Sequence, residues 1–191
     1  MIESQKQGCR KANAGFTLIE LVVVITILGI LAAIALPKFA STQRDARIAK
    51  LQAALGAVNS AAVVTHGAAL PRNGVVQPAD CVLANGLAQP PFLTSAGTGS
   101  LCSEAGNIRM VFGYPDHTFD GIVIAAGLQI SAGIPTSTTL LAEGWEVLAP
   151  AGGPVTIRPA NAPTPGSCQF TYTAAVVNGA PTVTAPVTTG C

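Results

Sequence analysis

The chain has 191 residues, of which 49% are hydrophobic, 10% charged and 5% aromatic, with a formal net charge of +1. This apolar content predicts one core of moderate size and argues against disorder. The chain also lacks the large excess of basic residues that is typical of nucleic-acid-binding proteins. Twenty glycines and 14 prolines exclude an all-helical protein.

A short basic segment precedes a long apolar segment at the N-terminus. Residues 1–15 carry Lys6, Arg10 and Lys11 against one acid, Glu3, and basic segments stay on the cytoplasmic side of a membrane. Residues 16–36 are almost all apolar, and as a helix they would reach about 30 Å, the thickness of a bilayer's hydrocarbon core. The sequence therefore predicts a leader over residues 1–15 and a membrane-spanning helix over residues 16–36.

A cleaved secretory signal peptide is the alternative for this N-terminus, with Ala33-Ile34-Ala35 as its cleavage site. The apolar stretch is longer than an ordinary signal peptide needs. It also contains Glu20, and an acid in a spanning helix costs roughly 2.5 to 3.5 kcal/mol on insertion scales. Such an acid needs a partner or a role, which a discarded segment does not provide.

A specific motif lies where the leader meets the apolar segment. Gly15-Phe16-Thr17-Leu18-Ile19-Glu20, followed by the apolar run to Leu36 and by Pro37-Lys38-Phe39, resembles the N-terminus of a type IV pilin of the IVa kind. The resemblance implies that a prepilin peptidase cuts between Gly15 and Phe16 and methylates the new N-terminal residue. Ala14 departs from the pattern, because the family often has a basic residue there. Scattered later segments, such as Gly113-Tyr114-Pro115, resemble pilins of the mannose-sensitive haemagglutinin kind.

Glu20 has a physical role if the chain is cut before Phe16. The cut frees an α-amino group with a pKa of about 7.7 to 8.0, four residues from the carboxylate. The resemblance implies that the Phe16 amine of one subunit neutralises Glu20 of its neighbour. Because an unpaired buried charge is strongly penalised, this pairing would favour one axial register in a filament. The alternative is that Glu20 reaches the lipid headgroups.

An amphipathic helix is predicted over residues 37–67. Apolar residues recur every three or four positions, the pattern of a helix that packs one stripe on a globular head. They are Ile48, Leu51, Leu55, Val58 and Ala62. The opposite side carries small residues, which would either admit another helix or form a solvated face. These are Ala53, Ala54, Gly56, Ala57, Ser60 and Ala61.

The whole predicted helix runs from Phe16 to His66, with Gly67 as its C-cap. Gly29 and Pro37 bracket its weakest point, because proline removes a helical hydrogen bond and clashes with the preceding turn. The resemblance implies that the segment between them loses helicity in an assembled filament. A simple kink is the alternative.

Residues 68–191 form the predicted head, in which strand-like runs alternate with turn residues. The predicted strands are 108–114, 144–148, 155–158, 169–177 and 181–188. Asn178-Gly179 predicts a hairpin turn between the last two, and residues 70–101 are predicted to be mostly loop. Residues 121–129 fit a short helix better than a buried strand. A long helix followed by antiparallel strands predicts an α+β fold.

Four cysteines remain once Cys9 is removed with the leader, and they predict two disulfides in an oxidising compartment. Three connectivities are open, and sequence proximity favours Cys81 with Cys102 and Cys168 with Cys191. Zinc is the rival, but none of the four forms a C-x-x-C pair.

The chain contains no P-loop, G-x-S-x-G or H-E-x-x-H motif. His117 between Asp116 and Asp120 suggests a cation site, for which a polar loop is the simpler interpretation. We therefore expect no enzyme, cofactor, metal site or nucleic-acid partner.

We therefore predict that the protein is a structural pilus subunit. Before assembly it is anchored in the bacterial inner membrane with its head in the periplasm. The inner-membrane assembly machinery then adds it to an extracellular homopolymer that serves adhesion or motility. One alternative is a pseudopilin of a type II secretion system. Another is a single-span membrane protein that never polymerises and whose head binds a ligand.

Overall fold

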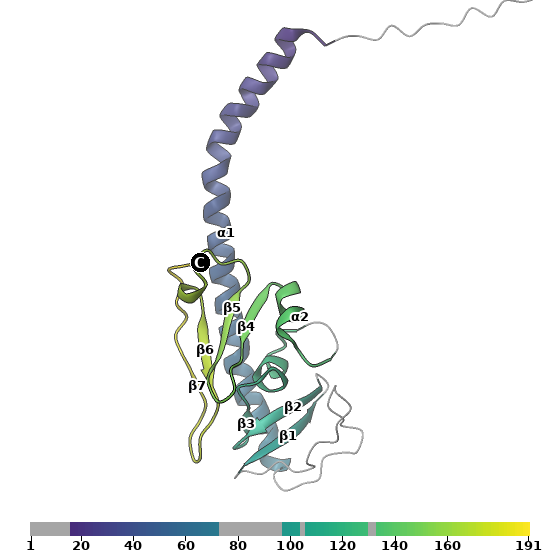
Figure 1. Ribbon diagram of the computed structural model, residues 1–191, viewed down its shortest axis with the longest axis vertical. Coiled ribbons are helices and arrows are strands. Elements are labelled where there is room, and N and C mark those ends of the chain that lie inside the picture. The colour runs from purple at the N-terminus through teal and green to yellow at the C-terminus, as the bar shows by residue number, and fades with distance from the viewer. Residues whose placement is uncertain (1–15, 73–96, 104–105, 130–132) are drawn as a thin grey trace, which may run out of the picture. The chain divides into compact units, whose positions relative to one another are not determined.

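The computed structural model describes residues 16–72, 97–103, 106–129 and 133–191 (Figure 1). The chain divides into two compact units, Met1–Thr42 and Gln43–Cys191. One long helix, α1 (Leu18–Ala69), contributes to both units, and its second part belongs to the head.

Helix α1 begins and ends slightly later than its sequence pattern predicts. Its start follows Thr17, whose hydroxyl accepts a hydrogen bond from the backbone N–H of Glu20 at 3.4 Å, as an N-cap residue does. The predicted end at His66 is wrong, because Gly67 lies inside the helix. Ala68 and Ala69 are good helix formers, and Ala69 is only 1% exposed in the second core of the head. A 3-10 turn, η1 (Leu70–Arg72), follows, and its proline stops the α-helix.

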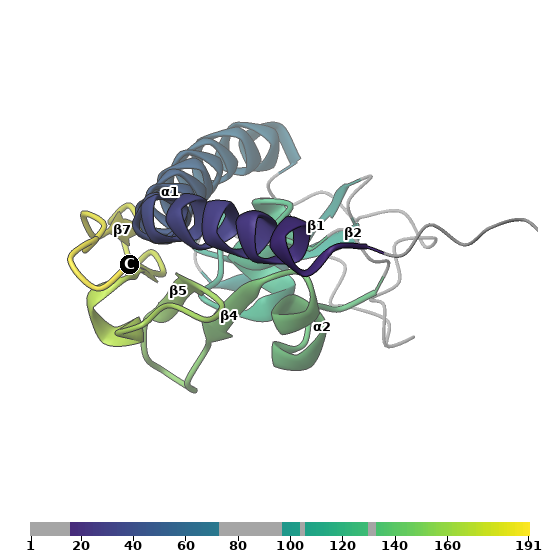
Figure 2. The same cartoon turned by 90° about the horizontal axis from the view of Figure 1, so that it is seen from above.

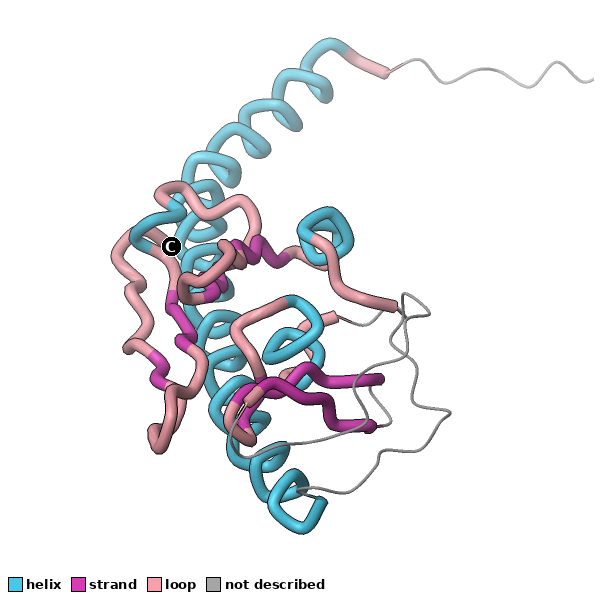
Figure 3. Tube along the Cα trace, turned by 60° about the horizontal axis from the view of Figure 1, so that its bottom comes forward, coloured by secondary structure: helices cyan, strands magenta, loops and turns pink. Residues whose placement is uncertain are grey.

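The head contains two antiparallel sheets, which confirms the α+β class (Figure 3). The first has the order β1-β2-β3 and consists of β1 (Thr98–Ser103), β2 (Gly106–Val111) and β3 (Tyr114–Pro115). The second has the order β4-β5-β6-β7 and consists of β4 (Trp145–Leu148), β5 (Val155–Pro159), β6 (Phe170–Thr173) and β7 (Thr182–Val183).

The first sheet differs from the prediction at both ends. The strand predicted over 108–114 is a hairpin of β2 and β3, because Phe112 and Gly113 both have positive φ, 48° and 79°. Positive φ at both central residues is the requirement of a two-residue type I′ turn. Strand β1 lies at the end of the predicted loop, where Thr98–Ser103 has few of the β-branched and aromatic residues typical of strands. Residues 73–96 of that predicted loop lie outside the described residues.

The second sheet has shorter C-terminal strands than predicted. Strand β7 has two residues, and prolines at 181 and 186, which lack a backbone N–H, flank it. The predicted hairpin turn at Asn178-Gly179 is shifted by one residue and lies in a long connection: the turn is centred on Val177 and Asn178, and the N–H of Gly179 donates to the carbonyl of Val176 at 2.9 Å. Asn178 therefore occupies the third position of the turn, with φ of 59°.

Shorter helical segments connect the two sheets. The helix predicted over 121–129 starts earlier, as η2 (Phe119–Val123), and continues for two residues. Helix α2 (Ser137–Ala142) begins with a reciprocal capping box between Thr136 and Thr139 and packs on β4. A short 3-10 turn, η3 (Pro165–Ser167), precedes β6.

The predicted apolar stripe of α1 forms the main core. Leu51 and Val58 are fully buried, Ala62 is 6% exposed, and Ile48 and Leu55 pack against the same cluster, which confirms the prediction. The second sheet supplies the facing side chains, among them Ile157, Phe170 and Tyr172. The prediction that all the small residues share one face away from the head is wrong. Ala54 and Ala61 are buried in this core, whereas Ala53, Gly56 and Ser60 are exposed.

Candidate functional site

The first half of α1 exposes its apolar side chains. Phe16 is 84% exposed, Leu18 80% and Ile19 71%, and the large apolar residues that follow remain exposed up to Phe39. Among the described residues, one helix, Leu18–Arg72, is long and apolar enough to cross a membrane, judged by length and composition. So much apolar surface is unfavourable in water, so it requires a covering of lipid or protein.

Glu20 lies in the first turn of this helix. Its backbone is held by the Thr17 cap, and its side chain is exposed. A carboxylate in the first turn is favourable, because the helix dipole is positive there. The structure thus places Phe16 and Glu20 at the same helix end, while Gly15 lies outside the described residues. The sequence analysis named Thr17 only as part of the motif and assigned it no capping role, although a threonine three residues before a glutamate is a capping-box pattern.

The predicted weak point of α1 is helical in the single chain. The helix continues through Gly29 and Pro37, so the loss of helicity in a filament stays a prediction. Two hydroxyls just beyond Pro37, those of Ser41 and Thr42, both donate to the Lys38 carbonyl at 2.9 Å. Such back-bonding competes with the helical ladder and often bends helices.

A disulfide between Cys168 and Cys191 closes the C-terminal segment and confirms the predicted pair, with S–S and Cα–Cα distances of 2.06 and 4.9 Å. Arg47 of α1 donates from Nη1 to the carbonyl of Cys191 at 2.8 Å. No sequence signal pointed to this bond, because it joins residues 144 positions apart. Cys102 is also disulfide-bonded; its predicted partner, Cys81, lies outside the described residues.

Lys50 forms hydrogen bonds between α1 and the residues just before β4. Its ammonium donates to the carbonyls of Gly144 at 2.7 Å and Glu143 at 3.3 Å, and it lies 4.3 Å from the centre of the Trp145 ring. Burial lowers the pKa of Lys50, because the charged form loses hydration. A Cβ at residue 144 would lie 2.7 Å from Nζ, and φ there is +81°, so this position requires glycine.

Two of the three residues considered for a cation, Asp116 and His117, contact each other, and no contact between them and Asp120 is seen among the described residues. The Asp116 carboxylate lies 3.2 Å from Nε of Arg109 and 2.8 Å from Nδ1 of His117, and it accepts the His117 backbone N–H at 2.7 Å. The neighbouring Tyr172 hydroxyl donates to the Pro115 carbonyl at 2.7 Å. Burial, then the negative charge of Asp116, raises the pKa of Tyr172. Within the described part of the chain, no three His, Cys, Asp or Glu residues are grouped to hold a metal.

Comparison with known proteins gives one family match at the N-terminus and several similar fimbrial or pilus proteins. Residues 10–36 match the prokaryotic N-terminal methylation motif. The chain is 36% identical over 109 residues to the fimbrial protein EcpB of Eikenella corrodens, covering 52% of this chain and 68% of that protein.

Two further relatives match shorter segments. Over 47 residues, the chain is 53% identical to the type IV narrow pilus major component PilA5 of Thermus thermophilus, covering 25% of this chain and 40% of the relative. Over 52 residues, it is 42% identical to a fimbrial protein of Pseudomonas aeruginosa, covering 27% and 34%. No solved structure matches the chain significantly. With the methylation motif at its N-terminus and more than two thirds of a fimbrial relative covered, the chain belongs to the type IV pilin family.

Proposed function

We propose that this chain is a structural subunit of a type IV pilus, cut after Gly15, methylated at Phe16 and polymerised through α1. The observation that carries the proposal is the exposed apolar first half of α1, most of which lies within the methylation motif of residues 10–36. Lipid covers this surface before assembly, and the same segment of other subunits covers it afterwards. Because hydrophobic burial is non-directional, one surface serves both purposes.

The charges at the helix end select how subunits align. The amine freed at Phe16 is largely cationic at neutral pH, and Glu20 lies one turn away in the same helix. In a stack of subunits with an axial offset, the amine of one meets the carboxylate of the next. Registers without this pair leave a charge unpaired in an apolar environment, which is strongly unfavourable.

The head part of α1 supports the same mode of assembly. Its exposed face carries Gly56, Ser60, Val63 and Val64, the two valines being 71% and 68% exposed. From Gln52 to Thr65 the helix has no charged residue, so neighbouring helices can pack there without burying charge.

The charge of the leader and the cysteines of the head determine the proposed orientation of the chain in the membrane. The basic leader stays cytoplasmic, the head folds in the periplasm where its disulfide forms, and the inner-membrane assembly machinery transfers the subunit to an extracellular fibre. Without the leader, the side chains count 7 Lys+Arg against 8 Asp+Glu, so many stacked copies accumulate little repulsion. We propose no catalytic activity, cofactor or nucleic-acid binding for the subunit, and we assign the fibre a role in adhesion or motility.

The processing test is mass spectrometry of subunits sheared from cells. The expected N-terminal peptide begins with methylated Phe16, and an uncut Met1 or a start at Leu36 would contradict the proposal. Long surface fibres containing this chain distinguish a pilin from a pseudopilin, whose fibre is short and periplasmic. Attachment and surface spreading of cells with and without the chain then measure adhesion and motility separately.

The register test replaces Glu20. Glu20→Gln is expected to abolish or strongly reduce sheared fibres while the subunit still accumulates in the membrane. Asp45→Asn is the matched control, because Asp45 is an exposed acid of the same helix, and it should leave fibre yield unchanged. Normal fibres from the Glu20→Gln chain would contradict the register argument while leaving the family assignment intact.

A further inference from the structure

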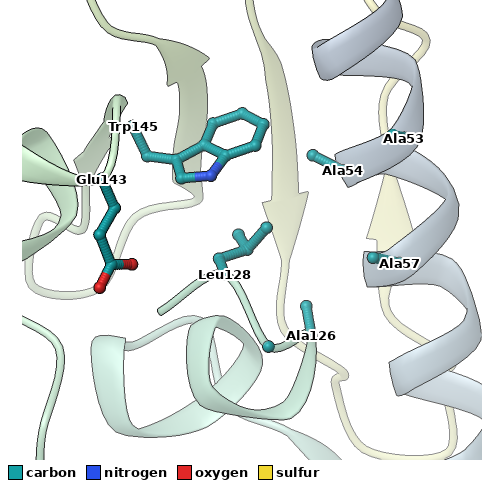
Figure 4. Close-up of a pocket in the computed structure, with 8 residues that line it drawn as sticks. Ala53, Ala54, Ala57, Ala126, Leu128, Glu143 and Trp145 are labelled. Atoms are coloured by element: carbon teal, nitrogen blue, oxygen red, sulfur yellow. The ribbon is translucent and has the colours of Figure 1, made fainter. Parts of the chain in front are cut away.

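An apolar groove of about 250 Å³ lies on the head between α1 and β4 (Figure 4). Ala53, Ala54 and Ala57 of α1 line one side of it and Leu128 and Trp145 the other, with Ala54 nearest the Trp145 ring and Ala126 at one end. Small-molecule sites typically enclose about 300 to 1,000 Å³ and place several polar groups inside. This groove is smaller and its walls are mainly alanine, leucine and tryptophan, so it suits one or two aliphatic side chains.

One charged residue, Glu143, is among the residues that line the groove, and the others are uncharged. Lys50, which lies over the Trp145 ring, already donates to two backbone carbonyls. The Glu143 carboxylate lies on the side of the groove away from α1 (Figure 4). Beside α1 the lining is alanine, leucine and tryptophan, against which a charge would lose hydration, so this part of the groove favours an uncharged, apolar segment.

The head carries such a segment at the tip of the β6–β7 connection. Val176 and Val177 are 63% and 68% exposed, and no residue from Gln169 to Cys191 is charged. The base of the tip is packed and its turn is hydrogen-bonded: Ala175 is 4% exposed, and the N–H of Gly179 donates to the carbonyl of Val176. A side chain at residue 179 would lie 2.8 Å from a methyl group of Val176. A hydrogen-bonded turn loses less conformational entropy on binding than an irregular segment does.

The groove and the valine tip belong to opposite edges of the four-stranded sheet. Trp145 lies in β4 at one edge, and the tip adjoins β7 at the other. Figure 2 also shows β7 and α2, which packs on β4, at opposite sides of the head. The tip therefore does not fill the groove of its own chain. A contact between two different patches of identical subunits is heterologous, and when it does not close into a ring it produces an open helical filament.

We infer that the occupant of the groove is a second copy of this chain, whose Val176–Val177 tip inserts between α1 and β4. The inference rests on the proposed function, since it assumes a polymer, and it adds a contact between heads to the contact between N-terminal helices. The contact joins each head to the next one sideways and makes the outer layer of the fibre cohesive.

The test introduces charges at both sides of the contact in the full-length chain. Val177→Lys and Ala53→Glu each place a charge in an apolar contact, and both wild-type residues are exposed in the single subunit, so folding is retained. Each substitution is expected to lower the yield of sheared fibres about tenfold. The double variant Val177→Lys with Ala53→Glu is expected to recover most of that loss, because the two charges then pair. Val187→Lys, at a 47% exposed valine outside the tip, is the matched control.

A crosslinking experiment identifies the partner directly. Cells co-express a chain carrying Ala53→Cys and a chain carrying Val177→Cys, so a disulfide between the two positions must join different copies. A crosslinked dimer in sheared fibres, absent when either chain is expressed alone, supports the inference. Unchanged fibres from Val177→Lys, no recovery in the double variant, or no mixed dimer would overturn it. If the unaltered chain forms no fibres, the proposed function fails instead, which distinguishes the two failures.

Discussion

The hydroxyl of Tyr172 connects the two sheets of the head, and its removal tests the packing described above. Tyr172 is fully buried in β6, and its hydroxyl donates to the carbonyl of Pro115 in β3 at 2.7 Å. Tyr172→Phe keeps the ring and removes the donor, so a buried carbonyl loses its partner. Such a loss costs about 1–3 kcal/mol in free energy of unfolding.

The same substitution changes the response to alkaline pH. The folded chain holds the pKa of Tyr172 above its usual range, chiefly by burial, whereas the unfolded chain ionises it at about pH 10. The stabilisation of the neutral tyrosine is therefore fully present below about pH 10 and is lost as the pH rises further. The Tyr172→Phe chain lacks this contribution, so its stability should decline less steeply above that pH.

Urea unfolding of the full chain in mild detergent measures both effects through Trp145, the one tryptophan of the sequence. Trp145 is 8% exposed in the main core, so its fluorescence reports the packing of the head. Tyr114→Phe is the matched control, because it retains the ring that stacks on His66 at 3.9 Å. A change below about 0.5 kcal/mol for Tyr172→Phe, the range of ordinary surface substitutions, would refute the reasoning.

Three further substitutions test the core, the disulfide and an ion pair in the same assay. Leu51→Ala empties a fully buried site of α1 and should cost about 2–5 kcal/mol; a loss under 1 kcal/mol would mean that the helix stripe is loosely packed. Cys168→Ser opens the link to Cys191, 23 residues away, and should cost about 3 kcal/mol, an expectation that fails if reducing agent leaves the unaltered chain equally stable. Glu146→Gln removes the 2.6 Å pair with Arg158 and should cost up to about 1 kcal/mol at pH 7. Because the Arg158 hydrogen bond lowers the pKa of Glu146, this last difference should vanish as the pH falls below the usual glutamate range, and a constant difference would contradict it.

Local sequence patterns were sufficient for the features that need only neighbouring residues. The apolar run, the stripe through Leu51 and Val58, and the motif at Gly15 and Phe16 are visible because helical periodicity and processing signals depend on short spacings. The pairing of Cys168 with Cys191 was also predicted, from proximity in the sequence. The predicted pairing of Phe16 with Glu20 belongs to an assembly of subunits and is tested by the fibre experiments.

The tertiary structure decided the features that depend on distant partners. Gly67 is helical because the next turn of α1 packs Ala69 into the second core of the head. Ala54 and Ala61 are buried because the head covers more of α1 than its apolar stripe. Lys50 meets the Gly144 carbonyl 94 positions away, and Arg47 meets Cys191 across 144 positions. Side-chain spacing within a helix determines which residues share a face, whereas the contacts of that face depend on how the rest of the chain folds back onto it.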